Sequence, residues 1–352
     1  MKTFSIALCL IAASAVTSLA GSLAGAERVA TEYKLAQLEW REQQLAGPSG
    51  SQEAPNREQF GDQMASQLRG ALHESWAMQY MVWILRVDPA LSAEGTKHLI
   101  SVAEKHHKDS PLLGEFCIAL TSAGESDDQK AIRVKLLQEK TRLIKAVMNN
   151  GARKSVKGQA ALALSGVLAR RGDEAGVNSQ RLQLIRQAII DAADAKVGDT
   201  TVAELAREEI YRISKLSKGA LAPELVGTNS GGVPMKLSDY KGKIAVLIFW
   251  SSWEQAESVI DFSKKMQKTY SGKPVEVIGV NRDSLENLRR LVVAGQSVGE
   301  SFTDPTGKLF QQYRVSSAPF CYVIDQSGRV QYSGAPGSFV DFAVSALLNP
   351  PK

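Results

Sequence analysis

The chain has 352 residues, of which 44% are hydrophobic and 22% charged, and its formal net charge is +5. This length exceeds what one hydrophobic core usually supports, so we expect two domains with the composition of an ordinary globular protein. The net positive charge is small, and the sequence has no basic cluster interleaved with aromatic residues. Both observations argue against nucleic-acid binding.

Residues 1–26 have the pattern of a secretory signal peptide. One positive residue precedes an apolar stretch from Phe4 to about Val16, and small residues follow. We expect cleavage after Ala26 or, earlier, after Ala20; the alternative is an uncleaved anchor, for which the apolar stretch is short. The mature chain would then have no membrane span and would lie in the bacterial periplasm or outside the cell, where disulfides persist.

Between residues 27 and 216 the apolar residues recur at helical spacing, which predicts an all-helical domain over this range. Two of the clearest segments, residues 131–151 and 159–173, end at or beside a glycine, which is a frequent helix stop signal. Residues 47–56 are rich in Gly, Pro and Ser and predict a loop or linker. No strand pattern and no hairpin turn stands out in this region, so we expect neither.

A weak internal similarity with a spacing of 44 residues runs through the helical region. It places Gly114 over Gly158, and Gly70 lies one further period toward the N-terminus. This period is typical of stacked helical hairpins of the HEAT or armadillo type, in which each hairpin buries its apolar face against its neighbours. An irregular helical bundle is the alternative. Such arrays bind more often than they catalyse, so we expect a protein or peptide partner.

The character of the chain changes near residue 217, and we expect an α/β domain over residues 217–352. Continuous apolar runs at Ile244–Trp250 and Val275–Asn281 predict buried strands. Helices are expected over residues 254–270, 284–295 and 338–349, and a hairpin over residues 320–335. Strands that alternate with helices in this way predict a sheet with helices on both faces.

Several short motifs occur together in this second domain. Ala222-Pro223 opens it, residues 237–243 lead into the first core strand, Phe249-Trp250 end that strand, and residues 315–325 surround Pro319. With these motifs, the region from Lys218 to Leu348 resembles the redoxin branch of the thioredoxin superfamily. It is most similar to the TlpA/ResA group of envelope thiol-disulfide oxidoreductases and to their AhpC/TSA relatives. The resemblance implies a thioredoxin-like fold and a role in cell redox homeostasis.

Active members of this family carry Trp-Cys-x-x-Cys at the start of the helix after the first core strand. The first cysteine attacks the substrate disulfide as a thiolate, and the second resolves the mixed disulfide. In this sequence Trp253 keeps its place, but Glu254 and Glu257 stand where the two cysteines would be. The peroxidatic cysteine of the AhpC/TSA relatives has no counterpart between Phe249 and Ser263 either. A carboxylate cannot perform thiol exchange, so we expect a degenerate site.

The two glutamates admit two interpretations. They could form a paired-carboxylate site that binds a cation or moves protons, since residues three apart share a helix face. They could instead cap the helix, which we favour because two carboxylates supply too few oxygen ligands for a cation. We expect Glu257 to be partly covered, which would raise the pKa of its carboxyl by desolvation. No metal and no cofactor are expected.

Ala318 and Pro319 match the cis-proline segment of the family. In active members this segment lies against the reactive cysteines and presents backbone groups to an extended substrate chain. Its presence fits two interpretations: a substrate groove that persists without the cysteines, or simple inheritance of the fold.

Outside residues 1–26, the chain has two cysteines, Cys117 and Cys321. Cys321 lies two residues after Pro319, so on a strand both side chains point to the same face, and it could be a relocated nucleophile. A cysteine in so apolar a strand is more often a buried core residue, and Cys117 has the same interpretation. A disulfide between them would require a Cα proximity that sequence alone does not establish.

These observations predict a secreted or periplasmic protein whose thioredoxin-like domain has lost its redox pair. We expect it to act in protein binding or scaffolding and not as an enzyme. The alternative is a divergent thiol-disulfide oxidoreductase or peroxidase that uses Cys321, alone or together with Cys117.

Overall fold

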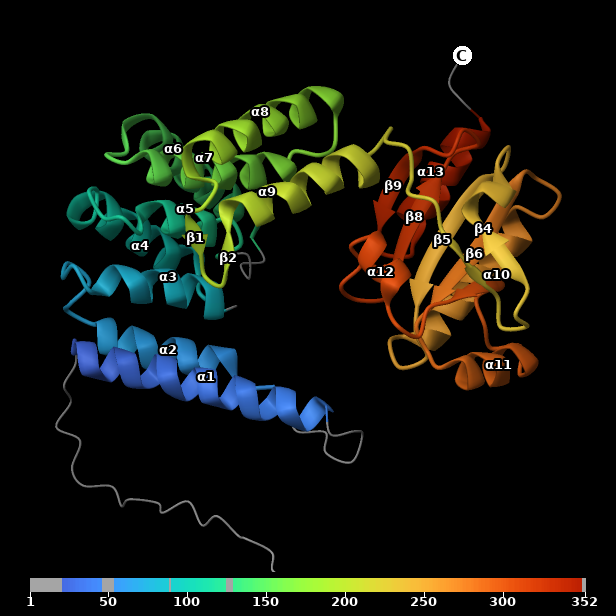
Figure 1. Cartoon of the computed structure of the whole chain (residues 1–352), viewed down its shortest axis with the longest axis horizontal. Coiled ribbons are helices and arrows are strands. Elements are labelled where there is room, and N and C mark those ends of the chain that lie inside the picture. The colour runs from blue at the N-terminus through green and yellow to red at the C-terminus, as the bar shows by residue number, and fades with distance from the viewer. Residues whose placement is uncertain (1–20, 46–53, 89, 125–128, 350–352) are drawn as a thin grey trace, which may run out of the picture. The chain divides into compact units, whose positions relative to one another are not determined.

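The computed structural model describes residues 21–45, 54–88, 90–124 and 129–349, which form two compact units (Figure 1). The second unit contains the chain from Arg207 onward together with the segment Arg171–Ser179, and the first contains the rest. Most of the predicted signal peptide, residues 1–20, lies outside the described residues. Within the described ranges, no helix is both long enough and apolar enough to cross a membrane.

The first unit is helical, as the spacing of its apolar residues predicts. Its helices are α1 (Leu23–Leu45), α2 (Arg57–Leu68), α3 (Ala77–Val87), α4 (Ala93–His106), α5 (Leu113–Leu120), α6 (Lys130–Asn150), α7 (Lys154–Ala169), most of α8 (Ala175–Ala192) and the first half of α9 (Val202–Tyr211). Asn56 and Ser92 cap α2 and α4 by accepting hydrogen bonds from backbone N–H groups of the first turn. The predicted loop at residues 47–56 falls between α1 and α2.

Neighbouring helices of the first unit pack in a regular succession. α3 packs on α5 and α5 on α7, while α4 packs on α6. Gly114 and Gly158 lie near the starts of α5 and α7, where an added Cβ would come within 2.4 Å of Gln159 and 2.5 Å of Ala192. Each glycine therefore allows its helix a close approach to a following one. Gly70 instead lies in a turn with φ of +80°, so its place differs and the repeat stays a prediction.

A small hairpin interrupts the helical region, and the expectation of no strands there is wrong at this point. β1 (Lys196–Val197) pairs antiparallel with β2 (Thr200–Thr201). Its two-residue turn is Gly198-Asp199, and Gly198 has φ of +63°. A Gly-Asp dipeptide is a known hairpin turn signal, so the sequence contained the information.

The second unit is built on a five-stranded sheet in the order β7-β6-β5-β8-β9. β5 (Ile244–Trp250) is parallel to β6 (Val275–Asn281) and antiparallel to β8 (Phe320–Ile324). β6 is parallel to β7 (Glu300–Thr303), and β8 forms the predicted hairpin with β9 (Val330–Gly334). The apolar runs predicted both central strands correctly. β7 was missed because it has four residues, of which only Phe302 is apolar.

Helices and short segments cover both faces of this sheet, as predicted (Figure 1). Alternate side chains of β5, from Ile244 to Trp250, enter a core shared with α10 (Ala256–Thr269), α11 (Leu285–Val293) and α13 (Ser338–Leu348). The others, such as Phe249, enter a second core on the opposite face. That core is shared with η1 (Arg212–Leu216), β4 (Pro234–Lys236), η2 (Leu237–Tyr240) and α12 (Lys308–Gln312); β4 itself pairs with β3 (Val226–Thr228).

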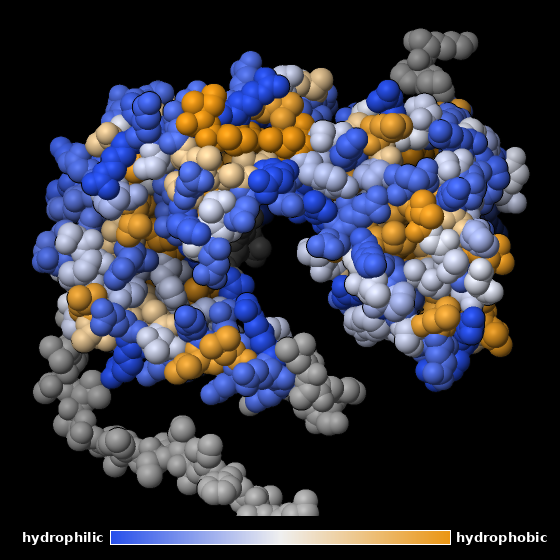
Figure 2. All heavy atoms as spheres, in the orientation of Figure 1, coloured by the Kyte–Doolittle hydropathy of each residue, from blue (hydrophilic) through white to orange (hydrophobic). Residues whose placement is uncertain are grey.

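The surface of the protein is mixed. On the face seen in Figure 2, hydrophobic residues form small patches separated by hydrophilic ones. Among the exposed large hydrophobic residues of the second unit are Trp253, Phe339 and Phe342, at 60%, 72% and 72% exposure. Trp253 belongs to the segment that the sequence singles out as the degenerate redox motif.

Candidate functional site

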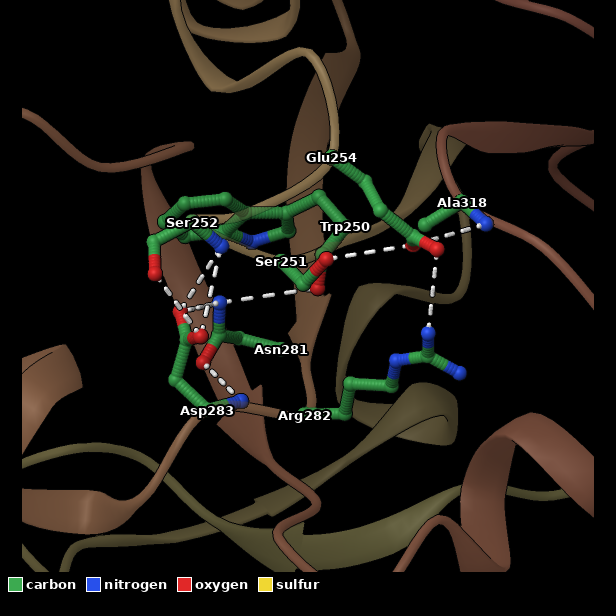
Figure 3. Close-up of polar contacts among 8 residues, drawn as sticks. All are labelled: Trp250, Ser251, Ser252, Glu254, Asn281, Arg282, Asp283 and Ala318. Atoms are coloured by element: carbon green, nitrogen blue, oxygen red, sulfur yellow. Dashed lines mark hydrogen bonds and ion pairs between the residues drawn. The ribbon is translucent and has the colours of Figure 1, made fainter. Parts of the chain in front are cut away.

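The candidate site lies at the carboxyl end of β5, where the chain turns into α10 (Figure 3). α10 begins at Ala256, and the residue before it, Gln255, has φ of +51°. Glu254 therefore precedes the helix and does not lie in its first turn. The expectation that Glu254 caps this helix is wrong, because its carboxylate is engaged by other segments of the chain.

Three protein groups hold the carboxylate of Glu254 (Figure 3). Its Oε2 accepts a hydrogen bond from the Ser251 hydroxyl and another from the backbone N–H of Ala318, each at 3.1 Å. Its Oε1 lies 3.2 Å from Nη2 of Arg282. The peptide bond that follows, Ala318–Pro319, is cis. Through one carboxylate, the turn before α10 is thus joined to the segment before β8 and to the end of β6.

Arg282 is itself fixed between two aromatic rings. The centre of its guanidinium lies 5.6 Å from the ring centre of Trp253 and 5.2 Å from that of Phe310. Its ion pair with Glu254 is shielded from water, since the two side chains are 27% and 28% exposed. Trp253, by contrast, keeps most of its surface in solvent. The result is an exposed indole whose ring lies against the guanidinium of Arg282.

A buried carboxylate anchors the same turn from the other side (Figure 3). Asp283, which is 1% exposed, accepts hydrogen bonds from the Ser252 backbone N–H at 3.1 and 3.2 Å and from the Ser252 hydroxyl at 3.0 Å. The side-chain amide of Asn281 donates to it at 2.9 Å, and Asn287 donates to the Ser252 hydroxyl at 3.0 Å. These contacts fix the position of the turn relative to β6.

Reasoning from sequence missed Asn281, which is the last residue of β6, and the two residues that follow it, Arg282 and Asp283. A signal for them existed, because carboxyl ends of adjacent parallel strands meet at one edge of a sheet, where sites commonly form. Three consecutive polar residues at the carboxyl end of a buried strand were a reason to look there.

Glu257 does not join Glu254. It is exposed in the first turn of α10, so the partial burial expected for it is wrong. Because Glu254 lies outside the helix, the two residues share no helix face and the paired-carboxylate interpretation fails. Among the residues that the structure describes, no group of three or more His, Cys, Asp or Glu side chains is placed to hold a metal ion.

Cys321 lies in β8 and is completely buried, in the core beneath α10 and α13. Burial raises the pKa of its thiol well above the usual value and so favours the unreactive neutral form. Cys117 is buried in the core of the first unit, with its pKa raised for the same reason. Both are free thiols, so no disulfide joins them.

Comparison with known proteins finds similarity to thiol-redox proteins. Residues 219–333 match the model of the AhpC/TSA family. The thiol-disulfide oxidoreductase ResA of Bacillus thuringiensis subsp. konkukian is 28% identical over 118 residues, which cover 33% of this chain and 68% of the relative. The ResA of Geobacillus kaustophilus is 26% identical over 163 residues, covering 44% of this chain and 88% of the relative.

Two solved structures can be added to these relatives. A thiol:disulfide interchange protein of the thioredoxin family from Chlorobium tepidum is 22% identical, covers 38% of this chain and 99% of that one, and has a TM-score of 0.34. The thioredoxin domain of a thiol-disulfide oxidoreductase from Bacteroides vulgatus is 20% identical, covers 38% and 100%, and has a TM-score of 0.35.

Proposed function

We propose that this protein, whose C-terminal unit is a thioredoxin-like domain of the redoxin branch related to thiol-disulfide oxidoreductases, binds a protein partner without performing thiol exchange. The observation on which this proposal depends is the position of the Glu254 carboxylate, which is bound by Arg282 and by the backbone N–H of Ala318. By the family resemblance, this is where an attacking thiolate would stand. A carboxylate held there has no sulfur with which to attack a disulfide.

The two cysteines of the described residues support the same proposal. A catalytic cysteine needs exposure and a lowered pKa, because the thiolate is the nucleophile. Cys321 and Cys117 have the opposite setting: both are buried and both have raised pKa values. This is the specific reason to prefer a binding role over an oxidoreductase or peroxidase that uses Cys321.

We assign the binding surface of this domain to Trp253, Arg282 and the Ala318–Pro319 segment. Tryptophan and arginine dominate the energetics of protein interfaces when they are held in place and then desolvated by a partner. Trp253 meets this condition, since it is 60% exposed and its ring is supported by Arg282. In this proposal the protein acts in the periplasm or outside the cell, and the helical unit supplies a further interaction surface.

An activity assay tests the non-catalytic part of the proposal. We expect the mature protein and its Cys321→Ser variant to show no insulin-disulfide reduction and no peroxide consumption above the uncatalysed background. Turnover by the wild type that disappears in Cys321→Ser would overturn the proposal. A redox-active thioredoxin assayed in parallel shows that each assay is working.

Partner capture tests the binding part. Proteins from envelope extracts that are retained by the wild-type mature chain should be lost with Trp253→Ala. They should be kept with Phe339→Ala, which removes a still more exposed aromatic side chain from α13. Retention that is the same for both variants would show that Trp253 is not part of the binding surface.

A further inference from the structure

Two of the four histidines in the sequence lie side by side on the surface of the helical unit. His106 is the last residue of α4, and His73 lies in the turns between α2 and α3. Their ring centres are 6.0 Å apart, and their ring planes make an angle of 59°. Both side chains are exposed, and the binding surface proposed for the C-terminal unit does not include them.

A third histidine joins the two segments that carry this pair. His107 is 4% exposed, and its Nε2 donates a hydrogen bond to the carbonyl oxygen of Leu72 at 2.7 Å. Leu72 directly precedes His73, and His107 directly follows His106. The hydrogen bond therefore connects the backbone beside one ring to the residue beside the other. The fold itself keeps the two imidazoles near each other.

The surroundings leave each ring with a nitrogen lone pair to offer. Oε1 of Glu74 lies 3.2 Å from Nε2 of His73. A carboxylate beside one ring nitrogen favours the tautomer that is protonated there, so Nδ1 of His73 is the free donor atom, as in many metal-bound histidines. Desolvation, the positive charge of Lys105 and the two neighbouring histidines lower the pKa of His106, so this imidazole is neutral at pH 7.

The spacing of the two rings suits one metal ion between them. A metal ion bound by an imidazole lies about 2 Å from the nitrogen and so about 3 Å from the ring centre. Two rings on one ion therefore have centres at most about 6 Å apart, and about 5 Å apart at a tetrahedral angle. His73 and His106 are at the upper end of this range, and rotation of two exposed side chains closes the difference.

We propose that His73 and His106 together bind one Cu²⁺ ion, with water completing its coordination. Imidazole is a preferred ligand of Cu²⁺, Ni²⁺ and Zn²⁺, and a given set of such ligands binds Cu²⁺ most tightly. Mg²⁺ and Ca²⁺ prefer oxygen ligands and gain little from two imidazoles. A site with two protein ligands is compatible with the finding that no group of three or more ligating side chains occurs in the described ranges. Its open positions make the bound ion exchangeable.

Titration of the mature chain, without an affinity tag, tests the proposal with Cu²⁺ chloride in a non-coordinating buffer at pH 7. We expect calorimetry to give one Cu²⁺ per chain and pulsed electron paramagnetic resonance to detect two imidazole rings on the ion. Ni²⁺ and Zn²⁺ should bind more weakly, and Mg²⁺ should not compete. No saturable binding of Cu²⁺, or a spectrum with one imidazole, would overturn the proposal.

Single substitutions locate the ligands. His73→Gln and His106→Gln should each weaken Cu²⁺ binding by at least about tenfold, because loss of a group outside the ligand set already has an effect of this size. Each variant should retain the signal of one imidazole. His98→Gln removes another exposed imidazole of α4 and should change neither the affinity nor the spectrum. Equal losses in all three variants, or unchanged affinity in the His73→Gln, His106→Gln double variant, would contradict the assigned site.

Discussion

The carboxylate of Glu254 accepts a hydrogen bond from the backbone N–H of Ala318, 64 residues away in the chain, at 3.1 Å. This N–H belongs to the residue before the cis proline, where active family members present backbone groups to an extended substrate. In this protein the N–H of Ala318 already donates to the Glu254 carboxylate. A partner that accepts a hydrogen bond from this N–H must displace Glu254, whereas a partner that binds the side chain of Trp253 need not.

Glu254→Ala should lower the free energy of unfolding by about 1–3 kcal/mol. The substitution removes three contacts and leaves Arg282 as a partly buried cation without its carboxylate. Urea unfolding followed by tryptophan fluorescence measures the change. Glu257→Ala, in an exposed position three residues later, is the control and should stay within about 0.5 kcal/mol of wild type. Equal effects of the two would show that the Glu254 contacts carry no net stability.

Converting both glutamates to cysteines should restore redox chemistry. The Glu254→Cys, Glu257→Cys protein would carry Trp-Cys-x-x-Cys after β5, with the first thiol beside Ala318–Pro319. We expect it to reduce insulin disulfides with dithiothreitol as reductant, while Glu257→Cys alone remains inactive because it lacks the attacking thiol. A folded but inactive double variant would mean that more than the sulfurs has been lost from this site.

Removal of the Asp283 carboxylate should lower the free energy of unfolding by more than a typical surface substitution does. Its oxygens accept hydrogen bonds from Ser252 and Asn281 while the side chain is 1% exposed, so Asp283→Ala leaves buried donors unpaired. We expect a loss of about 2–4 kcal/mol in urea unfolding. Glu286→Ala, an exposed carboxylate in the first turn of α11, is the matched control. A loss below about 1 kcal/mol would mean that water replaces the carboxylate.

Because Lys140 is buried, we expect the stability of the helical unit to vary with pH in the alkaline range. It is 3% exposed and its ammonium donates to the carbonyl of Ala123. Desolvation by burial lowers the pKa of Lys140 from its usual 10.5 to about 8. The unfolded chain therefore binds more protons than the folded one between pH 8 and 10.5, so stability rises with pH across this window.

Lys140→Met should remove this pH dependence. At pH 7 we expect the variant to be more stable than wild type by about 1–3 kcal/mol, because no charge is buried, and the difference should shrink as pH rises toward 10.5. Urea unfolding at pH 7, 8.5 and 9.5, read by circular dichroism of the helices, follows both proteins. Parallel pH profiles would show that burial does not shift this pKa.

The packing of α1 selects between the two predicted signal cleavage positions. Ser22 accepts a hydrogen bond from the N–H of Gly25 at 3.1 Å as α1 begins, and Ala26 is fully buried in the core of the first unit. Cleavage after Ala26 would remove this first turn, whereas cleavage after Ala20 leaves α1 whole. If the protein is exported, N-terminal sequencing of the mature form should begin at Gly21. A mature chain that begins at Glu27 would contradict this prediction.

Much of the fold could be predicted from local patterns. The runs Ile244–Trp250 and Val275–Asn281 are apolar without interruption, and only strands covered on both faces tolerate this, so β5 and β6 match the prediction residue for residue. α6 ends one residue before Gly151 and α7 ends three residues before Gly172, close to the predicted helix ends. The absence of cysteine between Phe249 and Ser263 is likewise a property of the sequence alone.

The tertiary structure alone decided what the side chains at the site do. The carboxylate of Glu254 turns to Arg282 and Ala318, 28 and 64 residues away, instead of capping the helix that follows it. Cys321 is closed into the core beneath α10 and α13, while Glu257 remains in solvent. A local pattern reports periodicity and turn chemistry, whereas hydrogen-bond partners and burial depend on which distant segments the fold brings together.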